Sequence, residues 1–120
     1  MRKSAAIIFA LLGLTLGPGR ADELADIRAV RSFAAEAAKV IDFSNQHRVT
    51  ATYAVVMKNQ ARSQLRNTAE SSDSPRVKKY AQRAMEAVNA NDAAALKHIA
   101  QELFTIERRR AHENDTGAAR

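Results

Sequence analysis

Between Asp22 and Thr116 this chain contains no glycine, and its only proline in that stretch is Pro75. Sheets and barrels need glycine at tight turns and β-branched residues in their strands, and neither is plentiful here. Alanine, which favours helix more than any other residue, is abundant instead. The sequence therefore predicts an all-α domain.

Apolar residues recur at helical spacing in four segments of the chain. We expect a first helix over about 22–43 and a second over about 48–69. A third should begin at Pro75, because proline suits a first helical position. The turn 89–92 should separate it from a fourth helix that ends near Ala111. Four helices joined by short turns predict a small antiparallel bundle.

The break between the first two helices, at residues 44–47, is weak, so one helix with a kink is an alternative there. Each helix has a predicted core face, defined by its apolar residues. In the first helix these are Leu24, Ile27, Val30, Phe33, Ala34, Ala37, Val40 and Ile41. In the second helix they are Val49, Tyr53, Val56, Gln60 or Ala61, and Leu65. In the third helix they are Val77, Tyr80 or Ala81, Ala84 and Val88, and in the fourth they are Leu96, Ile99, Leu103 and Ile106.

The first 21 residues have the pattern of a secretory signal peptide. Two basic residues are followed by an apolar stretch from Ala5 to Leu16, and small residues stand at Gly19 and Ala21. We expect cleavage after Ala21 and a periplasmic protein, with an uncleaved anchor as the alternative. The expected domains are then a signal peptide over 1–21, a helical bundle over 22–113 and a disordered tail over 114–120.

Charge and cysteine content exclude several classes of protein. Removing 21 of the 120 residues takes away three basic groups and lowers the net charge from +6 to +3. Nucleic-acid binding needs a dense basic stripe, so we expect no nucleic-acid partner. The chain has no cysteine. A disulfide, a lipoprotein anchor, a covalently attached c-type haem and a thiolate zinc site are therefore all excluded.

The start of the third helix carries an unusual cluster of cations. Arg76, Lys78 and Lys79 follow Ser74 and Pro75 in its first turns. Cations are disfavoured at this end of the helix dipole, by roughly 0.3–1 kcal/mol each. Serine hydroxyls, free N–H groups and three cations suit an anion or an acidic partner, so Ser74, Arg76, Lys78 and Lys79 form the candidate binding site. The alternative is that these cations only pair with the acidic first helix.

The sequence predicts no catalytic residues, no cofactor and no metal site. It contains no nucleophile elbow, no catalytic triad pattern and no glycine-rich phosphate loop. His98 and Glu102 share a helix face at i,i+4 spacing, but a metal site needs three or four ligands. A non-covalent haem between Met57 and His98 is a further alternative, although methionine is more often a core residue.

We therefore expect a non-enzymatic, protein-binding factor of the periplasm, acting as an adaptor, a chaperone-like factor or an inhibitor. In general character the chain resembles small exported helical proteins of Gram-negative bacteria, many of which bind other envelope proteins. The expected partner is an unidentified envelope protein or a second copy of the chain, with at most peripheral membrane contact. One alternative is peripheral binding to anionic envelope surfaces through the basic second and third helices. Another is a small metal-binding protein or enzyme.

Overall fold

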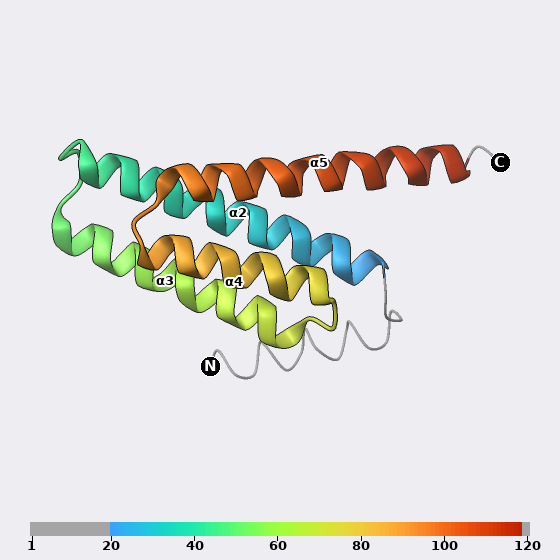
Figure 1. Ribbon diagram of the computed structural model, residues 1–120, viewed down its shortest axis with the longest axis horizontal. Helices are drawn as coiled ribbons and strands as arrows, with labels where there is room; N and C mark the ends of the chain where they lie inside the picture. The colour runs from blue at the N-terminus through green and yellow to red at the C-terminus, as the bar shows by residue number, and fades with distance from the viewer. Residues whose placement is uncertain (1–19, 119–120) are drawn as a thin grey trace.

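The computed structural model describes residues 20–118 and folds them into four helices (Figure 1). These are α2 (Arg20–Asn45), α3 (Ala51–Ser71), α4 (Pro75–Asn89) and α5 (Ala93–Ala118). No strand occurs in this part of the chain, so the prediction of an all-α bundle is confirmed. Of the predicted signal peptide, residues 1–19 lie outside the described residues, as do residues 119–120 at the other end.

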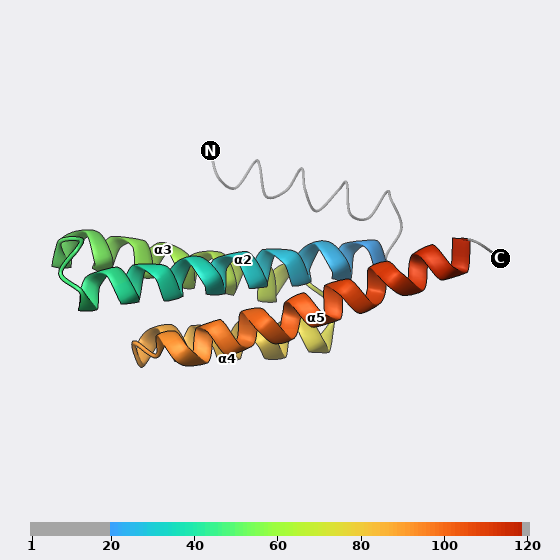
Figure 2. The same cartoon turned by 90° about the horizontal axis from the view of Figure 1, so that it is seen from above.

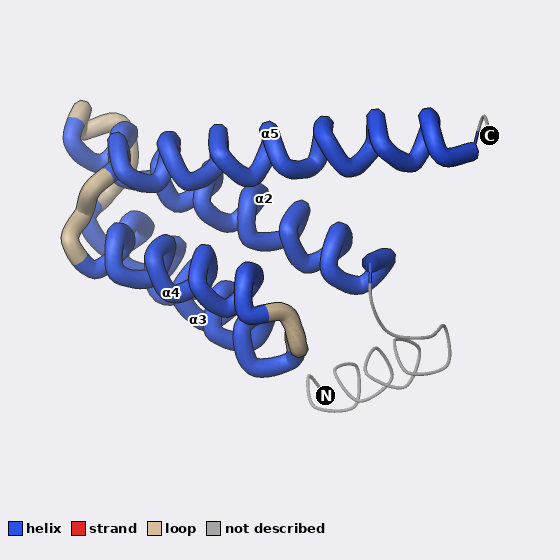
Figure 3. Tube along the Cα trace, turned by 45° about the vertical axis from the view of Figure 1, so that its right-hand side comes forward, coloured by secondary structure: helices blue, strands red, loops and turns tan. Residues whose placement is uncertain are grey.

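Successive helices run antiparallel, in two layers. Helices α2 and α3 form one layer and α4 and α5 form the other (Figure 2). The connections between helices lie at the two ends of the bundle (Figure 3). Helix α2 packs most extensively against α5 and also contacts α3 and α4. Short turns between long helices dictate this up-down-up-down order, because each helix must fold back on the one before it.

The core is built largely from alanine. Small side chains let the helices approach closely, and leucine, isoleucine and valine fill the space that remains. The predicted core faces of α2, α4 and α5 are confirmed, with Ala81 rather than Tyr80 buried in α4 and with Leu24, Phe33 and Ile106 only partly buried. The cluster of buried residues consists of Ile27, Val30, Ala34, Ala37, Ala38, Ile41, Ala61, Leu65, Val77, Ala81, Ala84, Ala87, Val88, Leu96, Ile99 and Leu103.

A full chain reversal, not a kink, separates α2 from α3. The backbone of His47 takes the left-handed conformation, with φ of 58°. The His47 N–H donates to the Ser44 carbonyl at 3.0 Å, and the Arg48 N–H donates to the Phe43 carbonyl at 2.8 Å. This pair of bonds is the Schellman motif that ends a helix. The kinked-helix alternative is therefore wrong, because the left-handed residue terminates α2 and Thr50 then caps α3.

The connection from α4 to α5 repeats this arrangement. Asn91 is left-handed, with φ of 53°, and the Asp92 N–H donates to the Ala87 carbonyl at 2.9 Å. The carboxylate of Asp92 then accepts the Ala95 N–H at 3.0 Å and caps the start of α5. The predicted turn at residues 89–92 is confirmed.

The start of α4 also follows the sequence prediction. Pro75 is the first residue of the helix, and the Ser74 hydroxyl accepts the Val77 N–H at 3.2 Å. A serine before a first-turn proline satisfies an N–H group that the helix itself leaves unpaired. Ser72, in the short loop before it, is buried and accepts the Ser74 N–H at 3.1 Å.

The predicted core face of α3 is wrong in the first half of the helix. Tyr53 and Val56 are about half exposed, and the buried position there is Ala54. The buried side of α3 is formed by Ala54, Ala61 and Leu65, which lie along one face of the helix. Val56 follows Ala54 by two residues and therefore lies on the opposite side of the helix, and Tyr53 lies beside the buried face. The first turns of α3 also extend past the end of α4 (Figures 1 and 2).

Helix α5 continues to Ala118, beyond the end predicted near Ala111. No proline or glycine interrupts the sequence before Gly117, so nothing in the local chemistry stops the helix earlier. The last turns of α5 extend past the other helices (Figure 1). The frayed tail expected from His112 onward is therefore helical through Ala118.

Candidate binding surface

The structure places most of the predicted basic site in contacts within the bundle. The Ser74 hydroxyl donates to the Glu23 carboxylate at 2.7 Å, and Arg76 lies 3.3 Å from the same carboxylate. The Lys78 ammonium donates to the Ala69 carbonyl at 2.7 Å, at the end of α3. The Lys79 side chain is exposed. This geometry favours the alternative hypothesis, in which these cations contact carboxylates and carbonyls of their own chain.

Glu23 is the centre of this cluster and joins three helices. In addition to Ser74 and Arg76, it accepts a hydrogen bond from the Arg110 guanidinium of α5. The hydrogen bonds from Arg110 and then Ser74 lower the pKa of Glu23 from 4.5 to about 2. The first turn of α2 is thus fixed to both α4 and α5 by one ionised carboxylate.

A second carboxylate, Glu102 of α5, contacts two groups of α4 and one of its own helix. The Tyr80 hydroxyl donates to it at 2.9 Å, and the Arg83 guanidinium lies 3.4 Å away. The Nε2 atom of His98, one turn earlier on α5, lies 2.8 Å from the same carboxylate. The Tyr80 and Arg83 hydrogen bonds lower the pKa of Glu102, whereas burial and then the Glu102 contact raise the pKa of Tyr80.

A third carboxylate, Glu107, is buried and pairs with α2. Its side chain contacts the Arg31 guanidinium and lies 3.4 Å from the Nε atom of Arg28. A buried ion pair holds a register well, because breaking it leaves an uncompensated charge. The three clusters position the helices, and each is satisfied within the bundle.

The residues of the metal alternative, His98 and Glu102, form the pair just described, and Met57 of the haem alternative lies on α3. Within the described residues, no three His, Cys, Asp or Glu side chains are grouped closely enough to hold a metal ion. Met57 lies half-buried on α3, and His98 is a largely exposed residue of α5. None of the helices over residues 20–118 has the length and apolar character needed to cross a bilayer.

The outer face of α3 differs from every other exposed helix face of the bundle. We define it by seven exposed, uncharged residues between Thr52 and Ser63. It contains valine and tyrosine and no charged group, whereas the exposed side of α4 carries arginine, lysine and glutamate. The members of the α3 outer face are Thr52, Tyr53, Val55, Val56, Asn59, Gln60 and Ser63.

The cations of this part of α3 are directed sideways, toward the end of α4. The Lys58 ammonium donates to the Asn91 side chain at 2.6 Å, and the Arg62 guanidinium donates to the Asn89 side chain at 3.0 Å. These bonds mark where α4 ends alongside α3. Tyr53, Val55 and Val56, which are 48%, 52% and 56% exposed, belong to the turns beyond that point.

Exposed apolar side chains on a face without charge are typical of a protein-binding surface. The centres of protein interfaces are depleted in charged residues and enriched in tyrosine, and contiguous exposed apolar groups commonly mark interaction sites. The sequence did not point to this face, because Tyr53 and Val56 fit a helical core stripe. The usable signal is the absence of any charge between His47 and Lys58 apart from Arg48.

Comparison with known proteins adds no family to this description. No protein-family model, curated protein or solved structure matches the chain.

Proposed function

We propose that this chain is an exported, non-enzymatic protein of the periplasm that binds another envelope protein through the α3 outer face. One observation carries the proposal: Tyr53, Val55 and Val56 are exposed together on a helix face that has no charge. A monomer gains nothing from exposing them, whereas a partner that covers them removes apolar surface from water.

The absence of charge favours a protein partner over an anionic surface. Anionic lipids attract clusters of lysine and arginine. On this part of α3, Lys58 and Arg62 are engaged with α4, and two of the three cations at the start of α4 are held by Glu23 and Ala69. A neutral face with tyrosine and valine instead fits an uncharged, apolar patch on a protein.

The proposal is tested by photo-crosslinking in the producing cells. A photoreactive amino acid placed at Val56 should form an adduct with a distinct envelope protein. The same amino acid at Gln82, an exposed position of α4, is the matched control and should form none. An adduct only with a second copy would replace the envelope partner with a homodimer. No adduct, or the same adducts from both positions, would contradict the proposal.

Export is tested separately, by the intact mass of the protein recovered from the periplasm. Cleavage after Ala21 predicts a chain that begins at Asp22. A mass that retains residues 1–21 would point to an anchored protein instead.

A further inference from the structure

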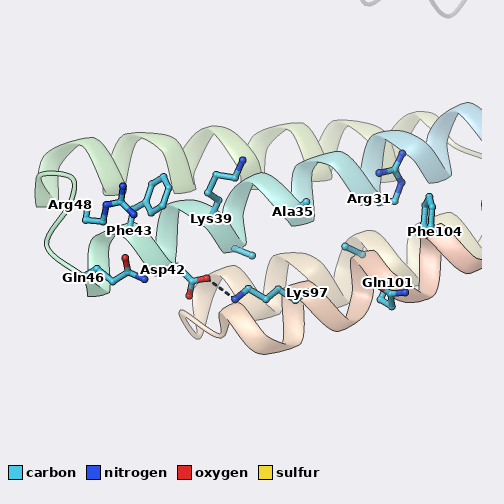
Figure 4. Close-up of a pocket in the computed structure, with 12 residues that line it drawn as sticks. Arg31, Ala35, Lys39, Asp42, Phe43, Gln46, Arg48, Lys97, Gln101 and Phe104 are labelled. Carbon is cyan, nitrogen blue, oxygen red and sulfur yellow. Dashed lines mark ion pairs between the residues drawn. The ribbon is translucent and has the colours of Figure 1, made fainter.

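A groove of about 510 Å³ lies between α2 and α5 (Figure 4). Its floor includes Ala35 and Ala38 of α2 and Ala100 of α5. Alanine side chains are too short to fill the space between two helices, so the groove stays open along them. Its volume lies in the range of small-molecule sites, roughly 300–1,000 Å³.

Each end of the groove has an aromatic ring with a guanidinium against its face. The Arg48 guanidinium lies 4.7 Å from the centre of the Phe43 ring, and that of Arg31 lies 5.6 Å from the centre of the Phe104 ring. Figure 4 shows the Phe43 pair at one end and the Phe104 pair at the other. From residue 31 to residue 43 a helix rises roughly 18 Å, so the groove is elongated.

The charge of the groove is positive. Lys97 is paired with Asp42 at 2.7 Å, and Arg31 is paired with the buried Glu107. Lys39 and Arg48, at the Phe43 end, form no ion pair with any carboxylate of the described residues, and both side chains are exposed. Two uncompensated cations beside an apolar floor attract a negative group that also has an apolar part.

We propose that this groove binds an organic carboxylate carried on an alkyl chain. The carboxylate lies between Lys39 and Arg48, and the chain extends over the alanine floor toward Phe104. A free inorganic anion would leave the floor and the second aromatic ring uncovered. A neutral amphiphile would leave the two cations without a partner. The groove shares no residue with the α3 outer face, so this binding does not rest on the proposed protein interface.

The test is calorimetric titration of the purified protein with dodecanoate and with dodecyl maltoside, both below the concentrations at which they form micelles. The two probes share an alkyl chain and differ in charge. Dodecanoate should bind at one site per chain, and dodecyl maltoside should bind at least about tenfold more weakly, since it has no charge to meet the cations. Equal affinity for the two probes, or no saturable binding of dodecanoate, would overturn the proposal.

Three variants locate the site. Ala35→Trp places a large ring in the groove from an exposed position and should abolish dodecanoate binding. Lys39→Glu reverses one of the two free cations and should weaken binding by about tenfold or more. Lys79→Glu makes the same change of net charge on exposed α4 and should leave binding unchanged.

The melting temperature of each variant identifies loss of fold. If Ala35→Trp does not fold, the comparison of Lys39→Glu with Lys79→Glu still decides the question. Equal weakening by these two lysine variants would mean that only net charge matters, and the proposed site would be wrong. Unchanged binding by a folded Ala35→Trp protein would place dodecanoate elsewhere.

Discussion

Two residues in the left-handed conformation, His47 and Asn91, make two of the chain reversals of this bundle. Glycine adopts that conformation without steric cost, whereas other residues adopt it less readily. Asparagine and histidine tolerate it better than most. In the residue that follows His47, the Arg48 guanidinium lies over the Phe43 ring, where a Schellman motif usually has a hydrophobic contact.

Replacing His47 with glycine should raise the free energy of unfolding by about 0.5–1 kcal/mol, because it relieves the left-handed strain. Asn91→Gly should gain less, since asparagine already tolerates the conformation. His47→Ala is the control and should not be more stable than the wild type. Urea denaturation measures all three. A His47→Gly protein less stable than wild type would show that the imidazole itself stabilises the turn.

The depressed pKa of Glu23 makes the stability of the bundle depend on pH. A carboxylate with a folded-state pKa of about 2, against 4.5 when unfolded, stabilises the fold fully above pH 4.5. This contribution is lost as the pH falls from 4.5 toward 2, because the unfolded chain then takes up the proton first. With the side chain 20% exposed, we expect about 2 kcal/mol at neutral pH.

Glu23→Gln tests this window. The wild type should exceed the variant in free energy of unfolding at pH 6, and the difference should shrink steadily between pH 4.5 and pH 2. Denaturation at a series of pH values measures it. A difference that does not change with pH would mean that Glu23 acts through packing or neutral hydrogen bonds instead.

For the individual helices, local signals in the sequence predicted most of the helix starts and buried faces that the structure contains. Ser74 and Pro75 start α4 as a cap and a first-turn proline should, and the apolar spacing of α5 places Leu96, Ile99 and Leu103 in the core. These features depend on a few neighbouring residues. The sequence could place them because capping and helical period are local properties.

Features that depend on how the helices pack and on distant pairs could not be predicted. In α3 the buried side is that of Ala54, Ala61 and Leu65 rather than that of Tyr53 and Val56, and no local pattern distinguishes the two. Glu23 is one of several acidic residues of α2, and no local pattern indicates that its partners Ser74 and Arg110 lie 51 and 87 residues away in the chain. The candidate site at Ser74–Lys79 was therefore identified as an anomaly, but its compensating carboxylate was not.

Leu103 tests the core face of α5. Its side chain is fully buried, so Leu103→Ala should lower the free energy of unfolding by roughly 2–5 kcal/mol. Chemical denaturation measures the loss. A loss below about 1 kcal/mol would show that this helix presents a different face to the core.

Arg76 and Lys79 form a matched pair at the start of α4. Arg76→Glu removes an ion pair with Glu23 and places two carboxylates together, so it should cost about 1 kcal/mol and lower the melting temperature by several degrees. Lys79→Glu makes the same charge change on an exposed side chain and should be neutral or slightly stabilising, because carboxylates suit a helix N-terminus. Thermal unfolding of both variants decides. Equal effects would show that Arg76 has no special role within the bundle.

In the whole molecule, the charged residues that join the helices lie apart from the uncharged α3 outer face. The carboxylates Glu23, Glu102 and Glu107 pair with cations of neighbouring helices and hold the bundle in register. Without cysteine, that register depends on packing and on polar contacts such as these pairs. The α3 outer face takes no part in it. Changes on this face should therefore alter binding and leave stability nearly unchanged.

The proposed binding of an envelope protein by the α3 outer face can be tested directly. The most direct measurement is the affinity of the crosslinked partner, once purified, for the wild type, for Val56→Asp and for the matched control Gln82→Asp. We predict that Val56→Asp weakens binding by at least about tenfold, since it buries a charge in an apolar interface. Gln82→Asp should bind as the wild type does, and all three proteins should melt at similar temperatures. Equal affinity of Val56→Asp and wild type would contradict the proposal that the partner binds the α3 outer face.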